Sequence, residues 1–111
     1  MFEKNLSISL LLDFYGDVLN ERQNEMMDMY YNEDYSLSEI ADEIGISRQG
    51  VRTVIKKAES ELFFYEEKLG LAKKMLTVEK YSESLCRLAD EHVIPENVKK
   101  EILQLAEAVR Q

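Results

Sequence analysis

Apolar residues recur at steps of three and four along almost the whole chain, which is the spacing of amphipathic helices. A first apolar stripe runs from Leu6 to Leu19 and predicts a helix over that stretch. Asn20, with Gln23 three positions later, can cap a second helix, which contains Met26, Met27, Met29, Tyr30 and Tyr31. Polar residues 32–35 then break the pattern. Strand-type alternation of useful length does not occur, so the sequence predicts an all-α fold.

The middle of the chain carries two strong signals for helix starts. Ser36, with Glu39 three positions later, forms a capping box. The helix that it opens is predicted to end at Gly45 in a left-handed conformation. Ser47 can cap a fourth helix, which is predicted to continue to about Leu69, where Gly70 interrupts it.

Two more helices are predicted after Gly70. Residues 72–91 form a segment with one broad apolar face, made of Met75, Leu76, Val78, Tyr81, Leu85 and Leu88. Pro95 suits the first turn of a last helix, because its missing N–H is not needed there. That last helix carries an apolar stripe of Val98, Ile102, Leu105, Ala106 and Val109.

Residues 37–54 have the spacing of a helix-turn-helix. Ala41 is small where two helices cross, Gly45 lies at the turn four residues later, and Val51 anchors the second helix. The remaining buried positions are predicted to be Ile40, Ile44, Ile46 and Val54. Such a unit directs the start of its second helix at the DNA major groove. Units of this kind also contact protein or RNA, and an ordinary helical pair in a bundle fits the same pattern.

Charge is distributed unevenly along the 111 residues. The net charge of −8 excludes a uniformly basic nucleic-acid coat and a polybasic membrane anchor. Residues 1–45 contain eleven acids and two bases, and residues 59–111 contain eleven acids and eight bases. Residues 46–58, the stretch of the predicted recognition helix, contain four bases and no acid. Such a local positive patch is what phosphate binding requires, whereas the acidic remainder predicts weak, strongly salt-sensitive binding.

The candidate DNA contacts lie in and beside this basic stretch. Arginine and glutamine on its leading turns can make bidentate contacts with guanine and adenine edges. Lysines further along are placed to meet phosphates, which position a protein without specifying sequence. Ordinary solvation of a helix surface is the alternative. The predicted DNA-binding residues are Ser47, Arg48, Gln49, Arg52, Thr53, Lys56 and Lys57.

Other kinds of chemistry find no support in the sequence. One cysteine, Cys86, and one histidine, His92, cannot make a Cys/His zinc site. None of the 22 acids has ligand or acid–base spacing beside a nucleophile, and no phosphate-cradling glycine loop occurs. We therefore expect no catalytic residue, no metal and no cofactor.

Several conspicuous residues are expected to be structural. We expect the methionines of residues 26–29, the tyrosines of residues 30–35 and Cys86 to pack in the core, and His92 to interact with carbonyls at a helix end. The apolar run Leu6 to Leu12 is too short to span a bilayer and lacks the flanks of a signal peptide. We expect no membrane contact and a cytoplasmic protein.

Four segments carry a resemblance to a known family: LLDFYG at 11–16, VLNERQ at 18–23, YYNEDYSLSEIA at 30–41 and GISRQGV at 45–51. These segments resemble the YlxM family of small bacterial proteins, which are similar to the DNA-binding region four of sigma factors. The resemblance covers about the first two-thirds of the chain, although Asn20 and Arg22 stand where the family more often has Thr and Lys.

The resemblance implies a sigma-region-four-like helix-turn-helix bundle and a bacterial, cytoplasmic, DNA-binding regulatory protein. Genes of the family typically lie beside the gene for the signal-recognition-particle GTPase. The resemblance therefore also implies an alternative, in which the protein is an accessory factor that contacts this GTPase or its RNA.

We expect two parts in the chain. The first is a helix-turn-helix domain at 1–70, and the second is a C-terminal helical extension at 71–111, which consists of the two additional C-terminal helices. A helix-turn-helix needs only three or four helices to close its core, so the extension brings two further apolar faces. Each fully buried aliphatic side chain contributes about 1.5–3 kcal/mol, which favours covering these faces. Folding back onto the first domain could cover one of them, and a second copy could cover both. We therefore predict a homodimer that presents two recognition helices to a palindromic site.

Overall fold

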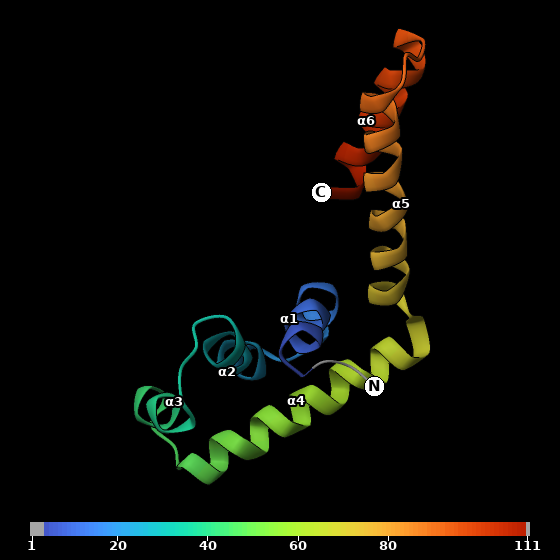
Figure 1. Ribbon diagram of the computed structural model, residues 1–111. Helices are drawn as coiled ribbons and strands as arrows, with labels where there is room; N and C mark the ends of the chain where they lie inside the picture. Colours follow the sequence, from blue (N-terminus) through green and yellow to red (C-terminus); the bar gives the residue numbers. More distant parts are fainter. Residues whose placement is uncertain (1–3, 111) are drawn as a thin grey trace. The chain divides into compact units, whose positions relative to one another are not determined.

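A computed structural model describes residues 4–110, with side chains described from Ile8 to Arg110. This part of the chain consists of helices and the loops between them and contains no strand, as the sequence predicted (Figure 1). Its elements are α1 (Lys4–Tyr15), the 3-10 helix η1 (Gly16–Val18), α2 (Glu21–Tyr31), α3 (Leu37–Ile44), α4 (Arg48–Leu69), α5 (Leu71–Glu91) and α6 (Glu96–Arg110). The chain divides into two compact units, Met1–Gly70 and Leu71–Gln111.

The first unit is built on α4, the 22-residue helix against which α1, α2 and α3 pack from one side (Figure 1). On α4 the buried residues recur at steps of three and four and so form a single stripe. Of the predicted core methionines, Met26 and Met27 are fully buried and Met29 is half-buried. The large side chains with the least exposure are Ile8, Leu11, Met26, Met27, Ile40, Val51 and Leu62.

Both predicted capping boxes are present. At the start of α2, the Asn20 side chain accepts from the Gln23 N–H at 2.8 Å, and the Gln23 side chain accepts from the Asn20 N–H at 3.0 Å. At the start of α3, the corresponding distances between Ser36 and Glu39 are 3.1 and 2.9 Å. The hydrogen bonds from Ser36 lower the pKa of the Glu39 carboxyl. Local sequence therefore determines where these two helices begin.

The first helix is shorter than predicted. It ends at Tyr15, and a 3-10 turn at Gly16–Val18 replaces the expected continuation to Leu19. The Gly16 carbonyl accepts two hydrogen bonds, from the Leu19 N–H at 3.1 Å, which closes the 3-10 turn, and from the Asn24 side chain at 2.9 Å. Val18 is consequently half-exposed, whereas Leu19 remains buried. The Leu6 side chain, which opens the predicted stripe, lies outside the described side chains.

A buried polar pair joins α1 to the end of α4. The Tyr15 hydroxyl donates to the Glu66 carboxylate at 2.6 Å, and both residues are buried. The Tyr15 ring also stacks on Tyr65, with 6.2 Å between ring centroids. A hydrogen bond to a charged acceptor contributes about 1.5–3 kcal/mol, so this pair helps to hold the first helix against the last turns of α4.

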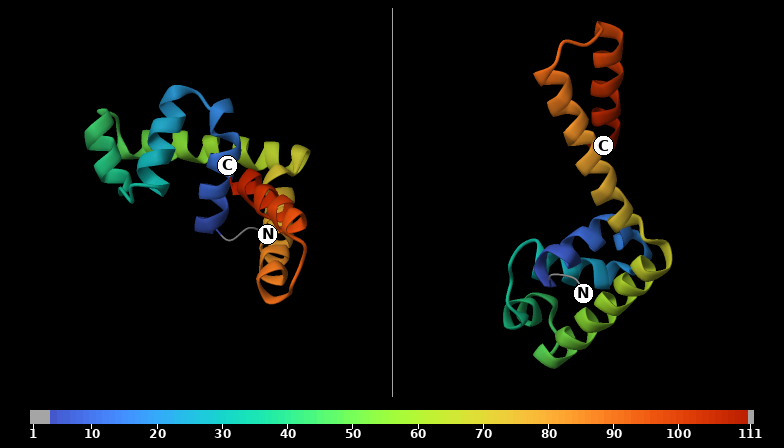
Figure 2. Two further views of the ribbon diagram at one scale, coloured as in Figure 1. Left: turned by 90° about the horizontal axis from the view of Figure 1, so that it is seen from above. Right: turned by 45° about the vertical axis from the view of Figure 1, so that its right-hand side comes forward.

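The second unit is an antiparallel hairpin of α5 and α6 (Figure 2). Among its described side chains, the buried ones are all small: Ala72, Ser82, Ala89 and Ala106. The predicted apolar face of residues 72–91 is therefore not the face that closes the hairpin. Leu76, Val78, Tyr81, Leu85 and Leu88 are exposed, and Met75 and Cys86 are half-buried, because the close contact with α6 admits only small side chains.

The loop between α5 and α6 differs from the prediction by one residue. Pro95 stands directly before α6 and not within its first turn, and its carbonyl accepts from the N–H groups of Val98 and Lys99. His92, at the end of α5, contacts the Leu88 carbonyl through Nδ1 at 3.1 Å, as expected for a histidine near a helix end. No helix within residues 4–110 combines the length and apolar character needed to cross a bilayer.

Two glycines end helices in the left-handed conformation. Gly45 ends α3 with φ 87°, as predicted, and Gly70 ends α4 with φ 63°. Gly70 is thus a C-cap whose N–H bonds to the Glu66 carbonyl, and α4 ends at Leu69, as predicted.

We expect Gly45→Ala to lower the free energy of unfolding by about 1 kcal/mol, because a side chain disfavours positive φ. No atom lies within 4 Å of the added Cβ, so backbone strain would be the sole cause. Urea denaturation measures the change. Gly16→Ala is the matched control, since its Cβ would make only an ordinary contact at 3.5 Å and no positive φ is involved. Equal effects of the two substitutions would contradict this explanation.

Candidate nucleic-acid interface

The turn between α3 and α4 determines where the basic helix begins. Gly45 reverses the chain, and the Ser47 Oγ then accepts from the Gly50 N–H at 2.9 Å, which caps α4. Below the turn, Ile40 and Val51 are fully buried. The two helices of the predicted helix-turn-helix are therefore fixed together at their crossing and capped at both starts.

Burial at this turn is less complete than the sequence suggested. Ile40 and Ala41 are buried as predicted, but Ile44, Ile46 and Val54 are only half-buried. Ile44 and Ile46 flank the exposed turn, and Val54 lies at the edge of the buried stripe of α4. The turn is consequently held by fewer apolar contacts than a fully enclosed one.

All seven predicted DNA-binding residues are exposed. Six of them lie on α4, in the intervals before and between the buried residues Val51, Ile55 and Ala58. Because of the helical period, these six residues share the face of α4 that points away from the core. The structure therefore brings Arg48, Gln49, Arg52, Thr53, Lys56 and Lys57 together on one surface, which we call the basic face. Ser47 adjoins this face at the N-terminus of the helix.

Hydrogen bonds already engage two of these seven residues. The Ser47 Oγ accepts from the backbone as the helix cap, so its hydroxyl proton is still available to a ligand. The Thr53 hydroxyl donates to the Gln49 carbonyl at 3.0 Å. Thr53 can therefore offer a ligand an acceptor or its methyl group without breaking that bond.

The four cations of the basic face are unpaired within the described part of the chain: none of Arg48, Arg52, Lys56 and Lys57 has an ion-pair partner there. The nearest acid along α4 is Glu59, one helical turn beyond Lys56. The Tyr31 hydroxyl, from the last residue of α2, donates a hydrogen bond to the Glu59 carboxylate. Burial and this bond raise the pKa of Tyr31 well above its usual value. The Glu59 carboxylate therefore lies beside the basic face, although it forms no ion pair with Lys56.

Two hollows border the basic face. One of about 340 Å³ is lined by Leu37, Arg48, Gln49 and Arg52. The other, of about 270 Å³, lies beside Arg52 and Lys56 and is walled by Tyr30, Tyr31 and Leu37. Sequence reasoning did not place these walls at the site. The tyrosines were interpreted as packing residues, and no local signal shows that they meet α4, because Tyr31 and Glu59 are 28 residues apart.

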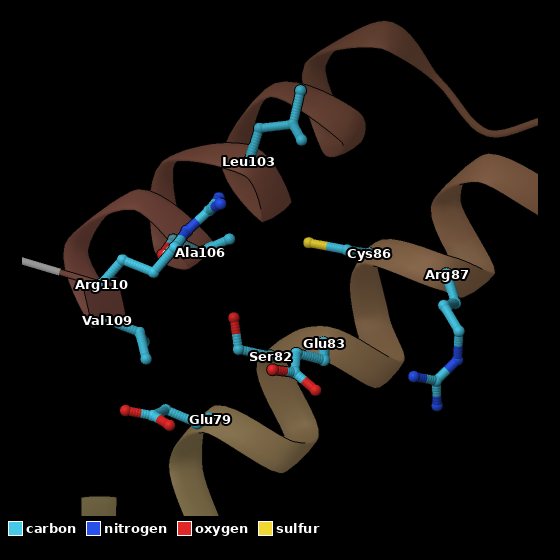
Figure 3. Close-up of a pocket in the computed structure, with 9 residues that line it drawn as sticks. All are labelled: Glu79, Ser82, Glu83, Cys86, Arg87, Leu103, Ala106, Val109 and Arg110. Carbon is cyan, nitrogen blue, oxygen red and sulfur yellow. The ribbon is translucent and has the colours of Figure 1, made fainter.

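A third and larger hollow, of about 630 Å³, lies between α5 and α6 (Figure 3). Its lining mixes acids, such as Glu79 and Glu83, with Arg110, small residues and Leu103. The Cys86 Sγ points toward α6, and the Arg110 guanidinium donates to the Ala106 carbonyl at 3.3 Å. No three His, Cys, Asp or Glu side chains within the described residues lie close enough together to hold a metal ion.

Comparison with known proteins places this geometry in context. A family model described as "Putative helix-turn-helix protein, YlxM / p13 like" matches residues 2–105. A UPF0122 protein of Caldanaerobacter subterraneus subsp. tengcongensis is 51% identical over 84 residues, which cover 72% of each chain. A UPF0122 protein of Listeria welshimeri is 43% identical over 106 residues, which cover 95% of this chain and 96% of the relative.

Proposed function

This chain belongs to the UPF0122 family of YlxM/p13-like helix-turn-helix proteins, and from that premise we propose that it is a non-enzymatic regulator that binds duplex DNA through the basic face of α4. One observation carries the proposal: four unpaired, exposed cations gather at the start of the second helix of a helix-turn-helix, in a chain whose net charge is −8. Phosphate neutralisation supplies much of the affinity in protein–DNA complexes.

The basic face divides into two kinds of contact. Arg48, Gln49, Arg52 and Thr53 lie on the leading turns, which in a helix-turn-helix reach base edges in the major groove. Arginine reads guanine and glutamine reads adenine through paired hydrogen bonds. Lys56 and Lys57 lie further along the helix and would contact phosphates. Ser47 would contribute its hydroxyl at the helix N-terminus, where anions are favoured.

Binding is expected to depend strongly on salt. If four cations each neutralise one phosphate, the logarithm of the affinity falls with a slope of about −4 per copy against the logarithm of salt concentration. This corresponds to roughly a hundredfold loss between 50 and 200 mM salt. Fluorescence anisotropy with a duplex selected from randomised DNA measures the slope. A double Lys56→Ala/Lys57→Ala variant should lower the slope by about 2. Failure of the selection to enrich any duplex would overturn the proposal.

We extend the proposal to a homodimer. Helix-turn-helix proteins commonly pair so that two recognition helices read half-sites one helical turn apart. The exposed apolar side chains of α5 and α6 offer surface for such pairing. We expect such a regulator to act in the bacterial cytoplasm, which contains the chromosome.

A second candidate function is an accessory factor that contacts the signal-recognition-particle GTPase or its RNA. The acidic character of residues 1–45, with eleven acids and two bases, favours a basic protein surface as partner over a nucleic acid. Calorimetric titration of the protein with duplex DNA, with the GTPase and with its RNA separates the candidates. Tight binding to the GTPase that is unaffected by Arg52→Ala, without DNA binding, would favour the second candidate.

A further inference from the structure

Leu37 forms the apolar wall of a hollow that borders the basic face. The hollow has a volume of about 340 Å³, and its other walls are Arg48, Gln49 and Arg52. The same leucine also lines the neighbouring hollow beside Lys56. Leu37 is the first residue of α3, the helix that packs on α4 and precedes it in the chain (Figure 1). A residue from outside α4 therefore shares the surface formed by its leading turns.

The apolar stripe of α3 extends beyond the core at this residue. Leu37, Ile40, Ala41 and Ile44 recur at steps of three and four residues, so they lie on one side of the helix. Ile40 and Ala41 are buried, whereas Leu37 is only half-buried. The capping box of α3 uses the residues before and after Leu37 and not its side chain. The uncovered part of this leucine therefore presents its methyl groups to the hollow.

The hollow combines two kinds of surface. Arg48, Arg52 and Gln49 offer N–H donors and an amide oxygen, while Leu37 offers only hydrocarbon. The major groove of DNA has the complementary chemistry. Every base pair presents hydrogen-bond donors and acceptors there, but only thymine adds an apolar group, its 5-methyl. An apolar wall among side chains that read base edges therefore fits a thymine.

We infer that Leu37 is a specificity-determining residue, whose side chain receives the methyl group of a thymine beside a base that Arg48 or Arg52 contacts. The two arginines are one helical turn apart on α4, and Leu37 lines the hollow with both of them. The inference rests on the proposed DNA binding. It adds a residue of α3 to the surface of α4 that reads the sequence.

Replacing thymine by deoxyuridine tests this contact, because the two bases differ only by the methyl group. The probe is the duplex selected from randomised DNA, with each thymine replaced in turn and the affinity measured by fluorescence anisotropy at fixed salt. One replacement should weaken binding of the wild type about fourfold, the effect of exposing one buried methylene-sized group. In Leu37→Ala, which lacks the apolar wall, the same replacement should have no measurable effect.

Thr53→Ser is the matched control. Among the six residues of the basic face, Thr53 alone carries a methyl group, but it does not line this hollow. Its replacement by serine keeps the hydroxyl that donates to the Gln49 carbonyl. We expect Thr53→Ser to retain the fourfold preference for thymine. Circular dichroism verifies that Leu37→Ala retains its helices. If it does not, Leu37→Gln makes the same test with a polar side chain of similar length.

The outcomes separate this inference from the proposed function. If the selected duplex binds but every deoxyuridine replacement leaves the affinity unchanged, the inference is wrong and DNA binding stands. The same holds if Leu37→Ala keeps the preference for thymine, if Thr53→Ser abolishes it, or if the selected site contains no thymine. If the wild type binds no duplex at all, the proposed function is wrong and the inference is wrong with it.

Discussion

Replacing Arg48 or Arg52 by alanine should weaken binding to duplex DNA by about 1–3 kcal/mol each, a loss of roughly 5- to 150-fold. Both side chains are exposed on the basic face, and neither has an ion-pair partner within the described residues. Their removal therefore takes away a contact to DNA without disturbing a contact inside the protein. Anisotropy titrations at fixed salt measure the loss, and circular dichroism should show unchanged helicity.

Lys68→Ala is the matched control for this experiment. It removes the same charge from the same helix, but Lys68 lies in the last turn of α4, where its ammonium group sits over the Phe64 ring at 5.6 Å. A general effect of net charge would weaken binding equally in all three variants. If both arginine variants bind as tightly as the wild type, DNA is not read by this helix.

Ile40→Ala should lower the free energy of unfolding by about 2–5 kcal/mol, the largest effect on stability that we expect from one substitution. Ile40 is fully buried where α3 packs on α4, so truncation leaves a cavity and removes apolar contacts. Domains of this size have a total stability of about 5–15 kcal/mol, so the loss is a large fraction of it. Urea denaturation followed by circular dichroism measures the change.

The control for Ile40→Ala is Val18→Ala, at a half-exposed position in η1 of the same unit. This substitution should change stability by no more than about 0.5 kcal/mol. A small effect of Ile40→Ala, comparable with that of Val18→Ala, would mean that α3 is not docked as described. The basic face would then lack the support that holds the start of α4.

Several features of the structure were predictable because their causes are local. The capping boxes of Asn20 and Ser36 each need only a residue three positions away. Gly45 adopts positive φ because a helix that ends in a turn needs a residue without a Cβ there. The exposure of the basic face followed from helical spacing and from charge, both of which are written along the chain.

Tertiary contacts decided the features that the sequence pattern misjudged. The first helix ends at Tyr15. The carbonyl of the next residue, Gly16, accepts a hydrogen bond from the side chain of Asn24, which lies eight residues further along the chain. Tyr31 reaches Glu59 across 28 residues, and Tyr15 reaches Glu66 across 51. Hydrophobic periodicity carries no information about contacts between positions so far apart in the chain. The residues that line the hollows beside the basic face could therefore be identified only from the tertiary structure.

By itself, then, the sequence determined the helices that follow the first one and the turn between α3 and α4. It also determined the basic character of α4. Helix propensity, capping and charge act within a few residues, so a local sequence pattern is enough to predict these features. Only the tertiary structure decided which apolar positions became core. Residues 72–91 carry enough apolar positions for more than one stripe, and periodicity treats all of them alike. The close approach of α6 selected the stripe with Ser82 and Ala89, since small side chains allow two helices to pack tightly, and it left Tyr81, Leu85 and Leu88 facing outward.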